Sequence, residues 1–376
     1  MQHSGRHVEN PIQIVQMMRT EDLDTPALIV DLDIMDANLL RVAAYAATHS
    51  LRLRPHTKTH KSTLLAKQQI ALGASGLTVA KVSEAEIMVG AESNDLLVAY
   101  PVLGPLKLAR LSGVARQTRV TVALDSLEAT QQLSAEAVAA KVQFGVLVEI
   151  DVGLHRVGVV PADALRLARA VMALPGLEWR GLTFYPGHIK EQSPEKIKAL
   201  SETVGSLRDE FVRAGLRPEI ISGGSTPALY HSHEIDGLNE IRPGTYIFND
   251  INTMISGACT LDQCAASILV TVVSHREQNR MIIDGGSKTF SSDRLVNGET
   301  GHGHLVEAPG ASFHKMNEEH GFIDLTRAER SFHIGEKVRL IPNHICVAVN
   351  LHEQVYGVRN GVVEKTWKVE ARGKLQ

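Results

Sequence analysis

Cysteine is scarce in this sequence. The 376 residues include three cysteines, Cys259, Cys264 and Cys346, which are too few and too irregularly spaced for the disulfide framework of a secreted protein. The sequence also lacks the run of about eighteen apolar residues that a membrane-spanning helix requires, and its N-terminal segment lacks the apolar core of a signal peptide. We therefore expect a cytoplasmic protein that neither enters nor crosses a membrane.

An excess of charge of one sign is absent as well. There are 39 lysines and arginines against 42 aspartates and glutamates, for a formal net charge of −3. Interspersed charges of both signs give no electrostatic footprint for nucleic acid or for an anionic membrane, so we expect a small-molecule partner. The 44% of hydrophobic and 22% of charged residues are typical of a globular protein with a substantial core.

Short apolar segments alternate with longer amphipathic segments through the first two thirds of the chain. The segments 162–173 and 194–214 carry apolar residues at helical spacing. Strands that alternate with helices predict a parallel α/β architecture. With eight strands, we expect a closed (β/α)8 barrel of the TIM type over residues 26–252. The expected strands are 52–58, 76–80, 96–101, 120–124, 145–151, 181–185, 220–223 and 240–243.

The sequence pattern changes after about residue 252, where short β-branched segments bounded by turns replace the alternating strand and helix segments. These segments predict a second, mostly β domain over residues 253–376, with residues 1–25 packed on it. Its expected strands are 268–273, 280–284, 337–341, 345–350, 354–358 and 362–369.

A cluster of basic residues, RPHTKTHK at 54–61, lies at the end of the first expected barrel strand. One interpretation is a solvated basic loop. The other is a lysine that forms a Schiff base, for which Lys58 stands at the catalytic end of a barrel strand. Its neighbours His56, His60 and Lys61 would provide the cationic or desolvated environment that lowers the pKa of such an amine.

Two glycines and two hydroxyl residues, Ser222, Gly223, Gly224 and Ser225, lie at the end of another expected strand. Glycines let backbone N–H groups approach an anion, and hydroxyls add donors, so the segment is a candidate phosphate cradle. An ordinary turn is an equally good interpretation.

A histidine and a cysteine, His344 and Cys346, stand two residues apart in one of the expected β segments. On a strand they would share a face and could bind one metal ion, although a buried cysteine packed as a small hydrophobe is the commoner case. Glu318, Glu319 and His320 are further acid and base candidates.

In order along the chain, these motifs resemble the D-threonine aldolase and D-serine dehydratase family, whose barrel is similar to the N-terminal domain of alanine racemase. The resemblance covers nearly the whole chain. It runs through DTPALIVDLD at 24–33, RPHTKTHK at 54–61, VAKVSEAE at 79–86, VEIDVGLHRVGV at 148–159, SGGSTP at 222–227, RPGTYIFND at 242–250, EEHG at 318–321 and PNHICVAVNLHE at 342–353.

The resemblance implies a pyridoxal 5′-phosphate (PLP) enzyme that forms a head-to-tail homodimer. By the match to the family motifs, Lys58 holds the cofactor, Arg156 bonds its phenolic oxygen and Tyr185 lies near its ring. The phosphate would be held by the segment Ser222 to Ser225 and by Gly244 and Thr245.

The family's metal pair corresponds to His344 and Cys346. Members similar to D-serine and D-3-hydroxyaspartate dehydratases carry His-x-Cys, whereas D-threonine aldolases tend to carry His-x-Asp. A thiolate ligand favours Zn²⁺ over Mn²⁺ or Mg²⁺. The segment NLHE at 350–353 is nevertheless aldolase-like, and YPGH at 185–188 fits neither group.

The resemblance therefore implies a PLP- and metal-dependent lyase for β-hydroxy D-amino acids. Our preferred hypothesis is a dehydratase of the D-serine or D-3-hydroxyaspartate type, which releases a 2-oxo acid and ammonia. The alternative is an aldolase of the D-threonine type, in which His320 or a metal-bound hydroxide takes the β-hydroxyl proton and glycine and an aldehyde form. A non-catalytic PLP-binding protein is a remote alternative, because it would need neither the metal pair nor a second domain.

Overall fold

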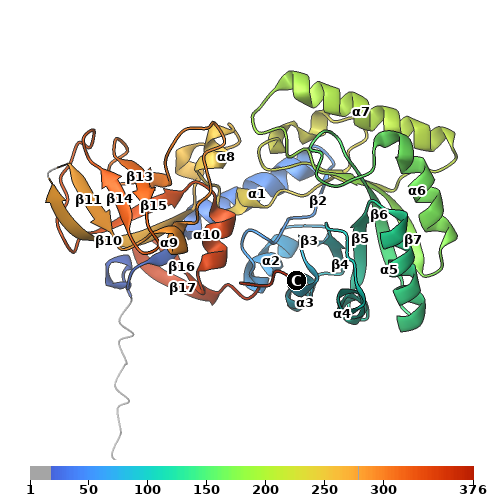
Figure 1. Ribbon diagram of the computed structural model, residues 1–376, viewed down its shortest axis with the longest axis horizontal. Helices are drawn as coiled ribbons and strands as arrows, with labels where there is room; N and C mark the ends of the chain where they lie inside the picture. Colours follow the sequence, from blue (N-terminus) through green and yellow to red (C-terminus); the bar gives the residue numbers. More distant parts are fainter. Residues whose placement is uncertain (1–17, 278) are drawn as a thin grey trace, which may run out of the picture.

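A computed structural model describes residues 18–277 and 279–376. Two bodies lie side by side, a barrel ringed by helices and a body of β-strands, and helix α1 runs between them (Figure 1). In the part of the chain that the structure describes, no helix is both long and apolar enough to cross a membrane.

The first body is an eight-stranded parallel sheet with the order β2-β9-β8-β7-β6-β5-β4-β3. A parallel bridge between His56 and Thr78 joins its two ends, with Thr78 N donating to Pro55 O at 2.8 Å. The sheet therefore curls into a barrel of the TIM type, and each of the eight expected strands is confirmed. The strands are β2 (Arg52–Leu53), β3 (Leu77–Val79), β4 (Asp95–Val98), β5 (Arg119–Leu124), β6 (Phe144–Ile150), β7 (Leu177–Phe184), β8 (Ile220–Gly223) and β9 (Glu240–Ile241).

Helices cover the outside of this barrel. In α7, Ser193 caps the first turn by accepting from Lys196 N, and Pro194 occupies the first helical position. Its buried face carries Ile197, Leu200, Val204, Leu207 and Phe211, the three- and four-residue spacing of an amphipathic helix. The helices are α1 (Leu32–Thr48), α2 (Thr63–Ala71), α3 (Val82–Met88), α4 (Pro105–Ala115), α5 (Leu127–Ala140), α6 (Pro161–Ala173) and α7 (Pro194–Arg213).

The second body is mostly β, as expected. Its sheet has the order β13-β14-β11-β10-β1-β16-β17, with β15 paired to β10 and β12 paired to β15. Two short helices, α8 (Ile251–Ile255) and α9 (Ser287–Phe290), accompany it. The strands are β1 (Ala27–Asp31), β10 (Ala266–Glu277), β11 (Arg280–Ile283), β12 (Gly303–Leu305), β13 (Ser312–Met316), β14 (Gly321–Asp324), β15 (Lys337–Pro342), β16 (Gln354–Arg359) and β17 (Val362–Lys368).

One expected strand is wrong. The segment 345–350 is not extended but forms helix α10 (Ile345–Leu351). A short apolar run does not distinguish a buried strand from a buried helix turn. His344 is the extended N-cap residue of this helix and Cys346 lies in its first turn, so the two residues do not share a strand face.

Strand β1 lies in the second body, although its residues fall within the range expected for the barrel. It pairs antiparallel with β10 and parallel with β16, and α1 then carries the chain to the barrel. Of the segment 1–25, which we expected on the β domain, residues 1–17 lie outside the described part. The remainder contacts that domain, since Lys337 Nζ donates to Glu21 O at 2.8 Å and to Leu23 O at 2.6 Å.

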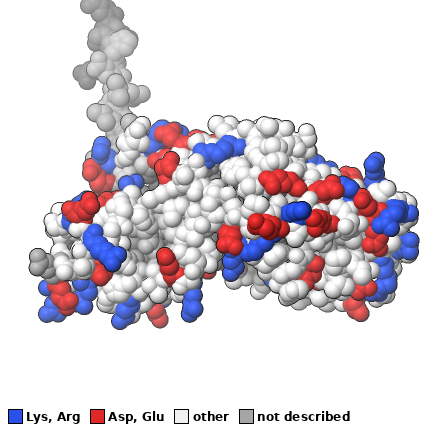
Figure 2. Space-filling view, turned by 90° about the horizontal axis from the view of Figure 1, so that it is seen from above, with Lys and Arg blue, Asp and Glu red and all other residues white. Residues whose placement is uncertain are grey.

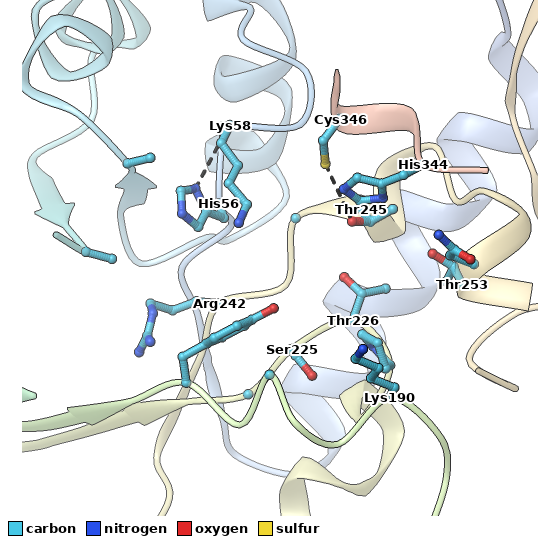
Figure 3. Close-up of a pocket in the computed structure, with 18 of the residues that line it drawn as sticks. His56, Lys58, Lys190, Ser225, Thr226, Arg242, Thr245, Thr253, His344 and Cys346 are labelled. Atoms are coloured by element: carbon cyan, nitrogen blue, oxygen red, sulfur yellow. Dashed lines mark hydrogen bonds between the residues drawn. The ribbon is translucent and has the colours of Figure 1, made fainter. Parts of the chain in front are cut away.

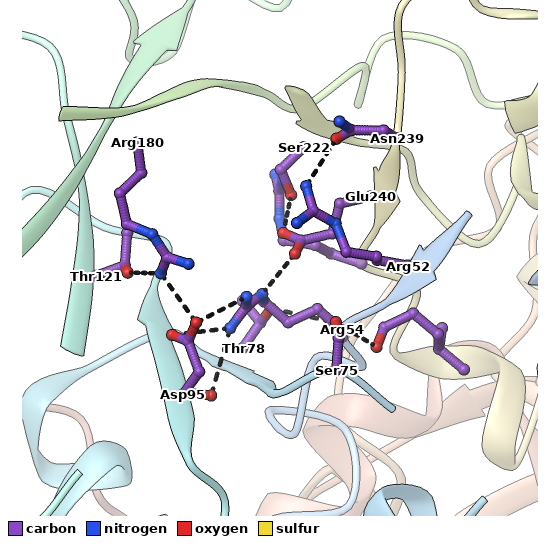
Figure 4. Close-up of polar contacts among 12 residues, drawn as sticks. Arg52, Arg54, Ser75, Thr78, Asp95, Thr121, Arg180, Ser222, Asn239 and Glu240 are labelled. Carbon is purple, nitrogen blue, oxygen red and sulfur yellow. Dashed lines mark hydrogen bonds and ion pairs between the residues drawn. The ribbon is translucent and has the colours of Figure 1, made fainter. Parts of the chain in front are cut away.

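A buried ion network lies in the interior of the barrel (Figure 4). Arg54 pairs with Asp95 at 3.2 Å and with Glu240 at 3.0 Å, and Arg180 pairs with Asp95 at 2.9 Å. Arg180 also donates to Thr121 Oγ1 at 2.7 Å. Each buried charge has a partner of opposite sign on another strand, so the network links β4, β7 and β9 across the barrel interior.

Acidic and basic side chains are interspersed on the face shown in Figure 2. That face carries no extended patch of one sign, in keeping with the near balance of charges in the sequence.

Candidate active site

A cavity of about 730 Å³ lies at the carboxyl ends of the barrel strands and is closed on one side by residues of the β body. Lys58 enters it from the barrel and the pair His344 and Cys346 from α10 (Figure 3). Nine residues selected from the sequence line this cavity: Lys58, Arg156, Tyr185, Gly224, Ser225, Gly244, Thr245, His344 and Cys346.

Lys58 lies on a tight turn that begins at the end of β2. Thr57 N donates to Thr78 O at 2.8 Å and Lys61 N donates to Thr57 O at 2.8 Å, which closes the turn. Lys58 N also faces His56 Nδ1 at 3.4 Å. Burial, reinforced by the charges of Lys58 and Arg242, holds the pKa of His56 well below its usual value. A neutral imidazole therefore lies beside the Lys58 amine.

The loops after β8 and β9 form a concave surface opposite Lys58. Gly224 has a φ of +88°, which favours glycine, and the hydroxyl of Ser225 is buried with no hydrogen-bond partner among the described residues. A Cβ on Gly244 would lie 2.9 Å from His56 O, so the backbone approaches closely there. A buried hydroxyl without a partner, beside glycine backbone, fits the phosphate of PLP.

Ser222 and Gly223, which we also expected to hold the phosphate, lie in β8 below the cavity. The Ser222 hydroxyl donates to Glu240 Oε1 at 2.7 Å and accepts from Arg242 at 2.6 Å. A Cβ on Gly223 would lie 2.3 Å from the Phe184 ring. The structure therefore gives these two residues packing and network contacts, because strand alternation turns the Ser222 side chain into the barrel interior.

Arg156 and Tyr185 lie together in the cavity wall, with the guanidinium 5.1 Å from the centre of the phenol ring. Glu149, at the end of β6, is a buried carboxyl in the same wall. Burial raises the pKa of Glu149, and the charges of Arg242 and Arg156 oppose that rise. Glu149 is not predictable from the sequence, because a single carboxylate at a strand end has no distinguishing pattern.

Arg242 was quoted in the RPGTYIFND motif but not selected as a site residue. Its side chain is buried, and it donates to Phe184 O at 3.0 Å as well as to Ser222. Burial lowers the pKa of Arg242, while Glu149 and Glu240 oppose that effect. This cation lines the cavity and is linked through Ser222 to Glu240 of the ion network.

His344 and Cys346, the candidate metal ligands, lie close together even though they are not on a strand. The thiol of Cys346 lies 3.1 Å from Thr59 Oγ1, on the turn that carries Lys58. Burial opposes ionisation of this thiol, but His344, Lys58 and the Thr59 hydrogen bond outweigh it and lower the pKa of Cys346. The adjacent Cys346 charge in turn raises the pKa of His344 well above its usual value. Each of the two groups therefore favours the charged form of the other.

Asp250, at the end of the RPGTYIFND motif, is a site residue that the sequence analysis missed. Its fully buried carboxylate accepts from His344 Nδ1 at 2.8 Å and from Ile345 N at 3.0 Å. An imidazole held through Nδ1 keeps Nε2 free for a metal ion. The donor set of imidazole and thiolate fits a divalent metal, although the described residues contain no group of three or more His, Cys, Asp or Glu arranged to hold one.

His320, our candidate base, lies outside the cavity. It is an exposed residue between β13 and β14, and its carbonyl accepts from Asn317 N at 2.9 Å. The described chain therefore does not bring His320 together with Lys58.

Two family models match this chain. Residues 30–251 match the N-terminal domain of alanine racemase, and residues 265–358 match a putative serine dehydratase domain.

Three relatives are similar over most of the chain. D-threonine aldolase of Arthrobacter sp. is 34% identical and covers 93% of both chains. 3-Hydroxy-D-aspartate aldolase of Paracoccus denitrificans (strain Pd 1222) is 33% identical over 99% of this chain and 98% of its own. D-threo-3-hydroxyaspartate dehydratase of Delftia sp. (strain HT23) is 33% identical over 86% of this chain and 91% of its own.

Solved structures show the same architecture. D-threonine aldolase from Filomicrobium marinum has a TM-score of 0.89 at 32% identity, over 96% of this chain and 99% of its own. A cysteine-to-alanine mutant of a D-threo-3-hydroxyaspartate dehydratase, in the metal-free form, has a TM-score of 0.86 at 30% identity, over 93% of this chain and 98% of its own.

Proposed function

Because the chain belongs to the D-threonine aldolase and D-serine dehydratase family of PLP-dependent lyases, which act on β-hydroxy D-amino acids, we propose that it is a dehydratase of the D-serine or D-3-hydroxyaspartate type. Its products would be a 2-oxo acid and ammonia. The observation that carries the proposal is the Cys346 thiol, which lines the Lys58 cavity beside His344.

Residues of the barrel, proposed here as the cofactor domain 26–252, would hold PLP. Lys58 would hold it covalently, Gly224, Ser225, Gly244 and Thr245 would take the phosphate, and Arg156 and Tyr185 would contact the ring. When bound, PLP supplies an electron sink that weakens the bonds at the substrate Cα. In this proposal the Lys58 amine would remove a proton from that carbon, and the neutral His56 beside it adds no second cation.

Residues of the β body, proposed here as the domain 253–376, would hold the metal ion. His344 and Cys346 are the protein ligands in this proposal, with Zn²⁺ preferred over Mn²⁺ and Mg²⁺ because one ligand is a thiolate. A divalent cation supplies a Lewis acid for the substrate's β-oxygen. Asp250 would orient His344 toward it.

We also propose that the enzyme is a cytoplasmic homodimer. The three cysteines are free thiols, as a reducing compartment requires. Leu103 and Leu106 are exposed, the latter by 83% of its surface, close to Pro101 in the cavity wall. A second copy of the chain would cover this apolar surface.

The aldolase activity is the second candidate, and the NLHE segment is the sequence feature that favours it. In the structure, His352 of that segment lies 3.2 Å from Thr289 O and does not line the cavity. Cys346 does line it. The dehydratase-like feature is therefore the one that reaches the reaction site, which supports dehydration.

The test is to quantify both sets of products from the same reactions. Purified enzyme with PLP and Zn²⁺ or Mn²⁺ is incubated with D-serine, D-threonine and D-3-hydroxyaspartate, and ammonia, 2-oxo acids, glycine and aldehydes are measured. L-Threonine is the stereochemical control. We expect 2-oxo acid and ammonia to exceed glycine and aldehyde, and a chelator to remove most of the activity.

Predominant formation of glycine from D-threonine would establish the aldolase and refute the dehydratase. Absence of all products, with PLP bound and metal present, would support a non-catalytic PLP-binding protein.

A further inference from the structure

The segment that follows β17 leaves the β body and packs on the barrel. Figure 1 shows the end of the chain beside α3, although β17 itself lies in the other body. Ala371 is fully buried in the core cluster of the barrel with Leu77, Val79 and Val82. Further along, Ser83 N and Oγ donate to Gln376 O at 2.9 and 2.7 Å. Residues 370–376, here called the clamp segment, thus contact the barrel, while Arg372 and Gly373 stay bonded to Glu353 and Asn350 of the β body.

The clamp segment also completes the start of α2. The N-cap residue Ser62 makes no side-chain capping bond. Instead, the Glu370 carboxylate accepts from Thr63 N at 2.5 Å and from Thr63 Oγ1 at 2.7 Å. A carboxylate from outside the helix therefore takes the capping role, since it satisfies an N–H of the first turn and lies at the positive end of the helix.

The same segment is tied to the Lys58 turn by Lys61. This lysine is only 5% exposed and has a φ of +51°, which is uncommon for a residue with a side chain. Its Nζ pairs with buried Glu84 at 2.9 Å and donates to Ala371 O at 3.2 Å, and its carbonyl accepts from Ala371 N at 3.0 Å. Lys61 is thus bonded to the clamp segment through both its backbone and its side chain.

Glu84 connects this pair to the cavity. Its second carboxylate oxygen accepts from Ala80 N at 2.7 Å, and Ala80 lines the cavity near Lys58. Because Lys61 N also closes the turn on Thr57, the turn that carries Lys58 is held at one end by the barrel and at the other by the clamp segment.

We propose that Lys61, Glu84 and residues 370–376 form a clamp that fixes the Lys58 turn, so that Lys61 is a positioning residue for Lys58. The lysine that would hold the cofactor is thereby coupled to the β body through β17. This inference rests on the proposed role of Lys58 in holding PLP, and it does not depend on which reaction the enzyme catalyses.

The test uses holoenzyme of Lys61→Met, of Lys61→Met with Glu84→Gln, and of the chain shortened after Glu370. The matched control is Lys67→Met, which removes another lysine from the same region, one whose partner Glu92 is exposed. The measurements are the rate of PLP release, followed by absorbance, hydrogen exchange of the 57–63 peptide, and the melting temperature.

We expect each clamp variant to release PLP about 3- to 30-fold faster than wild type and to exchange faster in the 57–63 peptide, the range found for residues that couple through packed networks. The Lys67→Met control should match wild type. In the double variant, Glu84→Gln removes the buried carboxylate that Lys61→Met leaves unpaired. The melting temperature of the double variant should therefore be closer to that of wild type, while PLP is still released faster. If Lys61→Met does not fold, the double variant and the shortened chain test whether the clamp holds the Lys58 turn.

Variants that melt earlier but release PLP and exchange in the turn as wild type does would overturn the clamp and leave Lys61 a structural residue. Borohydride trapping of the wild type separates the two proposals. Reduced cofactor on Lys58 with unchanged release in the variants rejects only the clamp, whereas absence of reduced cofactor on Lys58 rejects the proposed function.

Discussion

Lys58 is distinguished from the lysines near it by its surroundings. Lys61 is buried in its pair with Glu84, and the Lys81 ammonium lies 3.8 Å from the centre of the Tyr100 ring, outside the cavity lining. Lys190 lines the cavity but comes from the loop after β7, near Ser225 and Thr226 (Figure 3). Only Lys58 combines a position at a strand end with a neutral histidine beside it.

We therefore expect Lys58→Ala to abolish the visible absorbance of bound PLP, because Lys190, the other lysine among the described lining residues, comes from the loop after β7 and not from the turn at the end of β2. Lys190→Ala, the matched control, should retain that absorbance. Borohydride reduction of wild type followed by peptide mapping should place the reduced cofactor on Lys58. Its recovery on Lys61 or Lys81 would contradict the assignment.

At the scale of elements, one carboxylate connects two helices. Asp250 is the N-cap residue of α8, where Oδ1 accepts from Thr253 N at 2.7 Å. Its other oxygen accepts from His344 and from Ile345 N at the start of α10. The orientation of the metal-pair histidine therefore depends on how the two helix ends meet.

Asp250→Asn should lower the affinity for Zn²⁺ by about 10- to 100-fold, the usual cost of losing the partner that orients a ligating histidine. Zinc affinity measured by competition with a chelator checks this, with Asp293→Asn as the control, since Asp293 also lines the cavity but bonds Ser291. Equal affinity in wild type and Asp250→Asn would show that Asp250 does not orient the ligand.

In wild type, zinc affinity should fall at low pH, because a metal must displace the proton favoured on His344 by its raised pKa.

The sequence predicts those site residues that carry a recognisable functional group and also lie at the end of an expected strand. Lys58, Ser225 and Thr245 lie at or just after the carboxyl ends of expected barrel strands, and in a parallel barrel these ends all meet at one face. Contacts between distant segments are not predictable in this way. Asp250 and His344 are 94 residues apart, and no local pattern indicates that they meet. Helix α10 is not predictable from the sequence, because its apolar run is too short to show the 3.6-residue period of a helix.

At the scale of the molecule, the buried ion network joins strands that are far apart in sequence. Burial opposes ionisation of Asp95, but the charges and hydrogen bonds of Arg54 and Arg180 outweigh it and lower the pKa of this carboxyl. A carboxyl whose pKa is lower in the folded state stabilises the fold above its unfolded pKa of about 3.9, and that stabilisation is lost as the pH falls through the folded value.

Asp95→Asn should lower the free energy of unfolding by about 3–5 kcal/mol, because two buried arginines lose a charged partner. Measured by denaturant unfolding, the difference in free energy of unfolding between Asp95→Asn and wild type should be constant between pH 8 and pH 5. It should become smaller below about pH 4. Asp163→Asn, which removes an exposed pair with Arg166, should cost less than about 1 kcal/mol. A similar cost for both variants would mean that the barrel network does not stabilise the fold.

The position of β1 has a consequence for the order in which the molecule is made. Residue Ile29 of β1 faces Ser267 on one side and Tyr356 on the other. During synthesis, β1 therefore leaves the ribosome before the barrel strands but gains its second neighbour, β16, only after the barrel and β10 have emerged. A fragment that ends at residue 252 would keep both edges of β1 unpaired and open to other chains. The two bodies are distinct in shape, yet the β body cannot be completed during translation until the whole barrel sheet has emerged.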